Sequence, residues 1–236
     1  MTGPVGAPAP VPTHRQVTGL IPAYNEADHV GAVVGSALRH VGSVLVVDDG
    51  SSDGTDEVAR RAGAEVARHA VRRGKGAAIR TGLERLRGRG HRYLLLLDGD
   101  GQHDPEDAPA LIVAAEENGY DLVIGHRVLD PDFHGAVRYY TNLVGCNVLS
   151  RWTGLELLDS QSGFRLVRAG LLDEIELDAR GFEIETEMLL KLCRRGARVG
   201  HVEVRSVAPN RKSRLRPVRD VTRICVSALK YHYLTS

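Results

Sequence analysis

Short apolar runs alternate with amphipathic segments along the first half of the chain, and this alternation limits the fold more than any other feature. The apolar runs are rich in Val, Ile and Leu, which predicts buried strands. Between them, apolar residues recur every three or four positions, which predicts helices. Strands that alternate with helices form a mostly parallel sheet covered on both faces, so we expect an α/β fold built as an α/β/α sandwich. The predicted strands are 17–22, 43–49, 64–68, 93–97 and 121–125, and the predicted helices between them are 26–40, 55–63, 74–90 and 105–118.

The second half of the chain is less regular and shows no linker that would divide off another domain. Residues 1–15 are rich in Pro, Gly and Ala and are expected to form a disordered leader. We therefore interpret residues 16–236 as a single domain that ends in a basic segment and a helix. The expected elements of this half are helices over 135–152, 183–195 and about 217–233, and a strand over 197–206.

Composition excludes several classes of protein. The net charge of +1 gives no sign of nucleic-acid binding, and no apolar stretch approaches the ~20 residues that span a bilayer. Cys146, Cys193 and Cys225 have no metal-binding spacing, which favours free thiols in a reducing compartment. We therefore expect a cytoplasmic protein, with peripheral contact at the inner face of a membrane allowed by the basic segment. The sequence indicates no oligomeric state.

Carboxylates follow the predicted strand 93–97, the most apolar of the chain. Asp98 and Asp100 stand two residues apart, and Gln102 continues the alternation. Open α/β sheets bind ligands at the carboxyl ends of their strands. Mg²⁺ and Mn²⁺ prefer oxygen ligands and are often held by one or two carboxylates together with substrate phosphates. An isolated pair of this kind would favour a simple polar turn, but its position after a buried strand favours a cation site.

Two other motifs can be compared with known ligand loops. Residues 48–55, DDGSSDGT, do not begin an EF-hand, because Arg60 stands where the final glutamate is needed. Lys75 does not belong to a phosphate loop, since Gly76 follows it where Ser or Thr is required. Ile79 likewise excludes the dinucleotide fingerprint. The segment is therefore interpreted as the start of a helix that begins with a glycine and a lysine, and the N-terminus of such a helix suits the binding of an anion.

Together these motifs resemble family 2 glycosyltransferases of the GT-A fold. The likeness is strongest to dolichyl-phosphate mannose synthases and polyprenyl-phosphate glycosyltransferases, and it covers about residues 16–220. The segments that carry it, in order, are PAYNE (22–26), VVDDGSSDGT (46–55), GKGAAIRTG (74–82), LDGDGQHDP (97–105), DLVIGHR (121–127), DSQSGFR (159–165) and GFEIETEML (181–189).

The resemblance implies a nucleotide-sugar donor of the GDP-mannose or UDP-glucose type, Mg²⁺ or Mn²⁺, and inversion at the anomeric carbon. It places Asp49 beside the base or ribose, with Lys75 nearby. It assigns the nucleoside pocket to Pro22, Ala23, Tyr24 and Glu26. It assigns the cation that bridges the donor diphosphate to Asp98, Asp100 and Gln102.

The acceptor implied by the resemblance is a polyprenyl phosphate. Such a phosphate is already an anion, so it needs positive groups rather than a general base. Arginine suits phosphate oxygens because its planar guanidinium donates several hydrogen bonds. The resemblance places four arginines near the acceptor or donor phosphates: Arg127, Arg138, Arg211 and Arg214.

An alternative is a soluble family 2 glycosyltransferase that acts on a hydroxyl of a small molecule or glycan. That chemistry needs a general base, for which Asp159 is the candidate, with Glu185 behind it. Glu183 and Glu187 are four residues apart on one helical face and are interpreted as surface charge. A nucleotidyltransferase is disfavoured because the glycine-rich opening of its first helix is missing.

Overall fold

The computed structural model describes residues 14–128, 136–205 and 230. Of the predicted leader, only its last two residues are described, and they belong to the short 3₁₀ helix η1 (His14–Gln16). The predicted C-terminal helix and most of the basic segment also lie outside it. The fold below is therefore that of the described residues alone.

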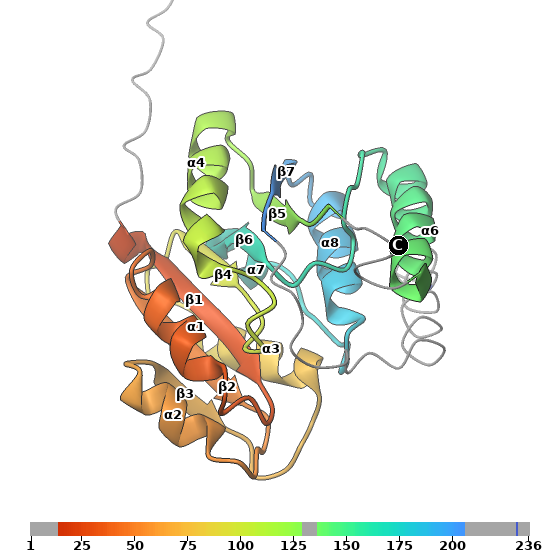
Figure 1. Cartoon of the computed structure of the whole chain (residues 1–236). Helices are drawn as coiled ribbons and strands as arrows, with labels where there is room; N and C mark the ends of the chain where they lie inside the picture. Colours follow the sequence, from red (N-terminus) through yellow and green to blue (C-terminus); the bar gives the residue numbers. More distant parts are fainter. Residues whose placement is uncertain (1–13, 129–135, 206–229, 231–236) are drawn as a thin grey trace, which may run out of the picture.

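The centre of the molecule is a seven-stranded sheet (Figure 1). Its order is β3-β2-β1-β4-β6-β5-β7. Only β6 runs antiparallel to its neighbours, so the prediction of a mostly parallel sheet is confirmed. The strands are β1 (Val17–Ala23), β2 (Ser43–Asp48), β3 (Glu65–Arg68), β4 (Tyr93–Leu96), β5 (Leu122–His126), β6 (Arg165–Arg168) and β7 (Val199–Glu203).

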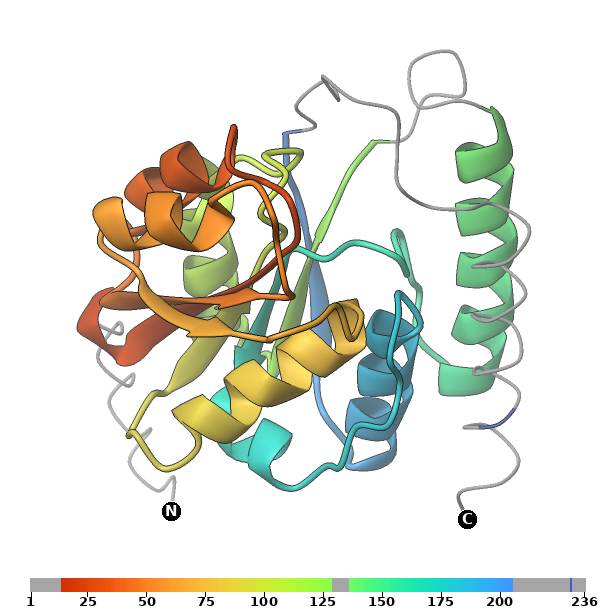
Figure 2. The ribbon, with the colours of Figure 1, turned by 90° about the horizontal axis from the view of Figure 1, so that it is seen from below.

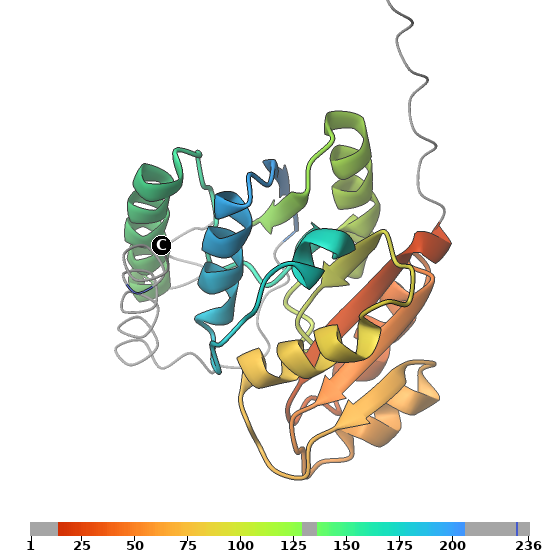
Figure 3. The same ribbon diagram turned by 180° about the vertical axis from the view of Figure 1, so that it is seen from behind.

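Helices cover both faces of the sheet and bury one apolar cluster on each face (Figures 2 and 3). This confirms the predicted α/β/α sandwich. One layer contains α1 (Val30–Ala37), α2 (Thr55–Arg61), the 3₁₀ helix η2 (Pro105–Asp107) and α4 (Ala108–Asn118). The other contains α3 (Lys75–Leu86), α6 (Ala136–Thr153), α7 (Ala169–Asp173) and α8 (Ile184–Arg194), with α6 at its outer edge beside α8.

Local sequence signals explain several helix boundaries. Asp104 accepts a hydrogen bond from the Glu106 amide at 3.0 Å and so caps η2, and α4 ends at the left-handed Gly119. Threonine is a favoured cap residue, but Gly54 holds the cap position of α2 and Thr55 is its first helical residue. The Thr55 hydroxyl instead accepts the amide of Glu26, which ties α2 to the loop after β1.

Topology brings the site residues together at one edge of the sheet. The parallel strands β1, β2, β4 and β5 all end there, and the antiparallel strand β6 begins there. Among the described residues, no helix is long and apolar enough to cross a membrane. Cys146 and Cys193 are free, as expected.

Candidate active site

The loops after β1 and β2 are joined by hydrogen bonds that shape the predicted nucleoside pocket. Asn25, with φ of 51°, donates its amide to Ser51 Oγ at 2.8 Å and accepts the amide of Ser52 at 2.9 Å. The neighbouring Glu26 is buried, and Tyr24 is half-buried under the guanidinium of Arg72, 4.3 Å from its ring centroid. Pro22 and Ala23 end β1 directly before this loop. The sequence indicates these loops through their Asn, Ser and Thr residues, whose side chains readily form hydrogen bonds with backbone groups.

Asp49 organises the segment that leads from β3 into α3. Its carboxylate accepts hydrogen bonds from His69 Nδ1 at 2.7 Å, the Arg73 amide at 2.8 Å and the Gly74 amide at 2.7 Å. The carboxylate is thereby fixed next to the start of α3, which carries Lys75. Contact of Asp49 with a base or ribose stays a prediction.

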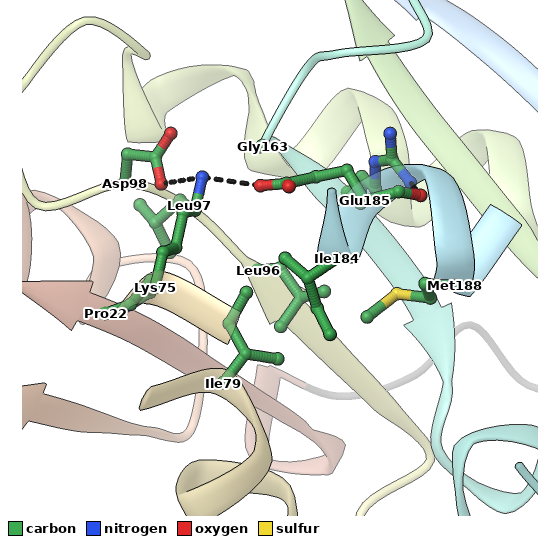
Figure 4. A pocket seen from close by; sticks show the side chains of 11 residues that line it. Pro22, Lys75, Ile79, Leu96, Leu97, Asp98, Gly163, Ile184, Glu185 and Met188 are labelled. Atoms are coloured by element: carbon green, nitrogen blue, oxygen red, sulfur yellow. Dashed lines mark hydrogen bonds and ion pairs between the residues drawn. The ribbon is translucent and has the colours of Figure 1, made fainter. Parts of the chain in front are cut away.

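Lys75 bridges two carboxylates that come from distant parts of the chain. Its Nζ lies 2.6 Å from Asp98 Oδ1, at the end of β4, and 2.6 Å from Glu185 Oε1, in the first turn of α8 (Figure 4). The preceding Gly74 has φ of 101°, and a Cβ there would lie 2.2 Å from the Arg180 carbonyl oxygen. Only glycine fits this turn, which explains why a glycine precedes the lysine.

Burial and charge act in opposite directions on this cluster. Burial alone would lower the pKa of Lys75, but the charges of Asp98 and Glu185 raise that pKa above its ordinary value. Burial alone would raise the pKa of Asp98, but Lys75 brings that pKa below its ordinary value. Burial raises the pKa of Glu185 in spite of Lys75. The cluster thus holds one ammonium between two acids in a low-dielectric setting.

The residues predicted to hold a divalent cation fit such an ion in their chemistry. Asp98 and Asp100 follow β4, and Asp100 Oδ1 accepts the Gln102 amide at 3.0 Å. Within the described ranges no three His, Cys, Asp or Glu side chains form a metal group by themselves. Two carboxylates and an amide oxygen would leave coordination positions for substrate phosphates, as Mg²⁺ sites commonly do. The ligand set itself stays a prediction.

Arg127 and Asp159, both predicted to be catalytic, form a buried pair. Arg127 Nε and Nη2 donate to Asp159 Oδ2 at 3.0 and 2.9 Å, and the Asp159 side chain is 0% exposed. Asp159 Oδ1 accepts the Gln161 amide at 3.1 Å. Both carboxylate oxygens are therefore engaged, one of them in orienting the guanidinium.

Arg165 is the residue of this site whose role sequence reasoning missed. It is fully buried, and its guanidinium donates to the carbonyl oxygens of Ser162, Glu185 and Ser160 at 2.7, 2.7 and 2.8 Å. These bonds tie the loop before β6 to α8. The strand β6 was missed as well, because arginines stand at both of its ends and leave only Leu166 and Val167 as an apolar signal.

The prediction that Glu187 is a surface charge was wrong. Its side chain is 0% exposed and accepts the amides of Asp178 and Ala179, both at 2.8 Å, and Lys191 at 2.7 Å. Glu183 is buried as well. Helical spacing alone cannot show that the segment before α8 folds back onto these acids.

The remaining predicted residues are described only in part. Arg138 lies in the first turn of α6, and the structure describes its backbone but not its side chain. Arg211 and Arg214 are outside the described residues. Arg205 is described, and it pairs with Asp107 at 2.8 Å and Asp104 at 3.2 Å on the surface.

Comparison with known proteins gives the family. The model of the family described as "Glycosyl transferase family 2" matches residues 19–176. The chain belongs to glycosyl transferase family 2. It is therefore a glycosyltransferase, and the resemblance drawn from the sequence is confirmed.

Two curated relatives of this family 2 glycosyltransferase cover most of its chain. "Glycosyltransferase AglJ" of Haloferax volcanii is 39% identical over 79% of this chain, which spans 61% of that protein's length. "Undecaprenyl-phosphate mannosyltransferase" of Micrococcus luteus is 32% identical, covering 80% of this chain and 82% of its own.

Solved structures agree with the fold. Glucosyl-3-phosphoglycerate synthase from Mycobacterium tuberculosis, crystallised with Mn²⁺, uridine diphosphate and glucosyl-3-phosphoglycerate, superposes with a TM-score of 0.74 at 23% identity. The match covers 92% of this chain and 80% of that one. At this identity the likeness shows the GT-A fold alone, and that fold is confirmed.

Proposed function

We propose that the protein transfers a hexose from a nucleotide sugar of the GDP-mannose or UDP-glucose type to a polyprenyl phosphate, with inversion at the anomeric carbon. An oxygen of the acceptor phosphate forms the new bond to C1 as the bond from C1 to the nucleoside diphosphate breaks. The electron pair leaves with the diphosphate, and no proton has to be removed from the acceptor. A single displacement of this kind inverts the anomeric centre.

The donor half is supported by the groups at the carboxyl ends of β1, β2 and β4. The loops after β1 and β2 would hold the nucleoside. Asp98, Asp100 and Gln102 would hold Mg²⁺ or Mn²⁺ against the diphosphate. The cation, when bound, supplies Lewis-acid stabilisation of the departing diphosphate. Lys75 stands beside Asp98 and adds a positive charge at the same place.

The single observation that carries the acceptor half is the buried pair of Arg127 and Asp159. Asp159 fixes the guanidinium, and a preorganised guanidinium is suited to binding a phosphate. The same hydrogen bonds occupy the carboxylate that the hydroxyl acceptor would need as a general base. The arrangement therefore favours the phosphate acceptor over the soluble hydroxyl acceptor. The Micrococcus luteus relative is named an undecaprenyl-phosphate mannosyltransferase, which agrees with this choice.

A place for the polyprenyl chain is suggested by α6. A groove that reaches Arg127 is formed by α6 and the loop that follows it. Its lining is mixed, with apolar side chains such as Leu143, Leu157 and Leu158 beside polar ones such as Asn147, Arg151 and Glu156. The outer face of α6 exposes large apolar side chains: Tyr140, Leu143, Val144 and Val148. The helix contains no Asp or Glu. An apolar, non-acidic helix face of this kind suits peripheral contact with an anionic bilayer, from which the polyprenyl chain would enter the groove.

A turnover assay tests the proposal. Purified protein is offered GDP-mannose and UDP-glucose in turn, with Mn²⁺ or Mg²⁺, with and without a polyprenyl phosphate, and products are identified by mass spectrometry. We expect a glycosylated lipid phosphate that forms only with the metal. Hydrolysis of the donor without any lipid product would reject the acceptor, and no reaction of any donor would reject the donor half.

A further inference from the structure

We propose that Lys75 competes with the divalent cation for Asp98 until a nucleoside diphosphate binds, and that Glu185 is a positioning residue that holds Lys75 at the site for this exchange. The inference rests on the proposed function, since it concerns the same donor site. It goes further by assigning a role to Glu185, which neither the donor nor the acceptor chemistry uses.

The competition follows from the surroundings of Asp98. Its Oδ1 pairs with Lys75 at 2.6 Å. Its Oδ2 lies against Gly163, where an added Cβ would be 2.6 Å from that oxygen. A cation that binds Asp98 must therefore approach a carboxylate already neutralised by an ammonium and closed on one side by backbone. Two positive charges on one carboxylate repel each other, more strongly in a partly buried site than in water.

A nucleoside diphosphate removes this conflict. It brings several negative charges that both the cation and the ammonium can share. Lys75 is the first residue of α3, so the partial positive charge at that end of the helix also favours an anion there. Cation and nucleotide should therefore bind synergistically, each raising the affinity of the other by the same factor.

Glu185 gives Lys75 a second ion-pair partner during the exchange. Its Oε1 lies 2.6 Å from Lys75 Nζ, and its Oε2 is buried without a hydrogen-bond partner. Arg165 donates to the Glu185 carbonyl oxygen and thereby anchors this turn of α8. Figure 4 shows Lys75 between the two acids, above the apolar side chains of Ile79, Leu96 and Ile184. With Glu185 in place, Lys75 keeps a partner when Asp98 turns to the cation. Without it, Lys75 would pair with Asp98 alone.

The test is a set of Mn²⁺ titrations on the whole protein, by calorimetry or by the electron paramagnetic resonance signal of free Mn²⁺. Each titration is run alone and with saturating GDP or UDP. For the wild type we expect weak binding of Mn²⁺ alone and an increase of about 5–150-fold in affinity with one of the nucleotides. Equal affinity with and without either nucleotide would overturn the proposal.

Variants separate the role of Glu185 from simple charge. Lys75→Met should bind Mn²⁺ alone about tenfold more tightly and lose most of the nucleotide effect. Glu185→Gln should bind Mn²⁺ alone more weakly than the wild type. In the Lys75→Met background, Glu185→Gln should change the affinity no further, because Glu185 acts through the lysine. If it still weakens Mn²⁺ binding there, Glu185 acts directly on the metal and the positioning role is wrong.

Controls keep the outcome clear. Lys75→Gln repeats the loss of charge with a polar side chain in case the methionine variant does not fold, and thermal melting checks every variant. Glu174→Gln removes a carboxylate from an exposed ion pair with Arg195 and should leave Mn²⁺ binding unchanged. If the wild type fails to bind Mn²⁺ both in the presence of GDP and in the presence of UDP, the donor half of the proposed function is rejected as well. If the nucleotide raises the Mn²⁺ affinity of the wild type and Lys75→Met shows the same Mn²⁺ affinities as the wild type, only the inference about Lys75 and Glu185 is rejected.

Discussion

The proposed donor side and the proposed acceptor side of the site both bury charge, but they balance it differently. On the donor side, Lys75 is shared between Asp98 and Glu185, so the cluster has an excess of negative charge. On the proposed acceptor side, Arg127 donates twice to Asp159 Oδ2, and the other carboxylate oxygen of Asp159 accepts the Gln161 amide, so the pair is closed with one charge of each sign. We infer from the comparison that the proposed donor side can exchange partners when a metal and a nucleotide bind. The acceptor side is built to hold one guanidinium still.

The largest expected effect breaks the closed pair. Arg127→Ala leaves the fully buried Asp159 without its partner, which should cost about 3–5 kcal/mol of unfolding free energy. Denaturant unfolding measures the loss, and the double variant Arg127→Met with Asp159→Asn should recover part of it. As a matched control, Arg87→Ala breaks an exposed pair with Asp173 and should cost less than about 1 kcal/mol. A loss as small as the control's would show that the pair is not a buried charge pair.

The second prediction removes a proposed metal ligand on the donor side. Asp100→Asn should lower metal-dependent turnover by at least about 100-fold, because the cation would lose one of its two carboxylates. Its unfolding free energy should stay close to that of the wild type, since Asp100 is only half-buried. Steady-state rates over a range of Mn²⁺ concentrations make the measurement. Full turnover at saturating Mn²⁺ would mean that Asp100 is no ligand.

The third prediction uses the space beside Asp98. Gly163→Ala places a Cβ 2.6 Å from Asp98 Oδ2 and 3.1 Å from Lys75 Nζ, so the cluster must shift. We expect a loss of about 1–3 kcal/mol of stability and weaker binding of Mn²⁺ with nucleotide. Gly170→Ala is the matched control, since nothing lies within 4 Å of its added Cβ. If both variants behave alike, the close approach at Gly163 has no role in the site.

The smallest expected effect is a pH dependence on the acceptor side. Burial first, and then the neighbouring His126, lower the pKa of His201 to about 4. The unfolded chain therefore takes up this proton near pH 6.5, before the folded protein does, and stability falls as the pH drops from about 6.5 towards 4. Between pH 7 and pH 5, His201→Gln should lose about 1 kcal/mol less stability than the wild type, which is about half of what the pKa shift alone gives, because solvent screens this partly exposed side chain. Urea unfolding measures the stability of both proteins at the two pH values. If the wild type and His201→Gln lose the same stability between them, the assignment to His201 is contradicted.

Sequence reasoning succeeded where the cause of structure is local or periodic. The alternation of apolar runs and helical segments predicted β1 to β5 and their helices, because burial on both faces imposes that pattern. The placement of Asp98 and Asp100 at the end of β4 followed from the same pattern, because parallel strands bring their carboxyl ends to one edge.

It failed where two distant segments meet. Glu185 was placed behind Asp159, the candidate general base, and its pairing with Lys75, which is 110 residues away in sequence, was not foreseen. Glu187 looked like a surface charge because the amides that it accepts belong to a segment without periodicity. The strand β6 was missed because arginines stand at both of its ends and leave only two apolar residues as a strand signal.

The most direct test of the account compares two acceptors that differ only in the reacting group. With the donor and metal that support turnover, polyprenyl phosphate and the corresponding polyprenol are offered under identical conditions, and products are quantified by mass spectrometry. The account predicts transfer to the phosphate and none to the alcohol, because Asp159, the candidate general base, is engaged with Arg127. Efficient transfer to the alcohol would contradict it and restore Asp159 as the general base.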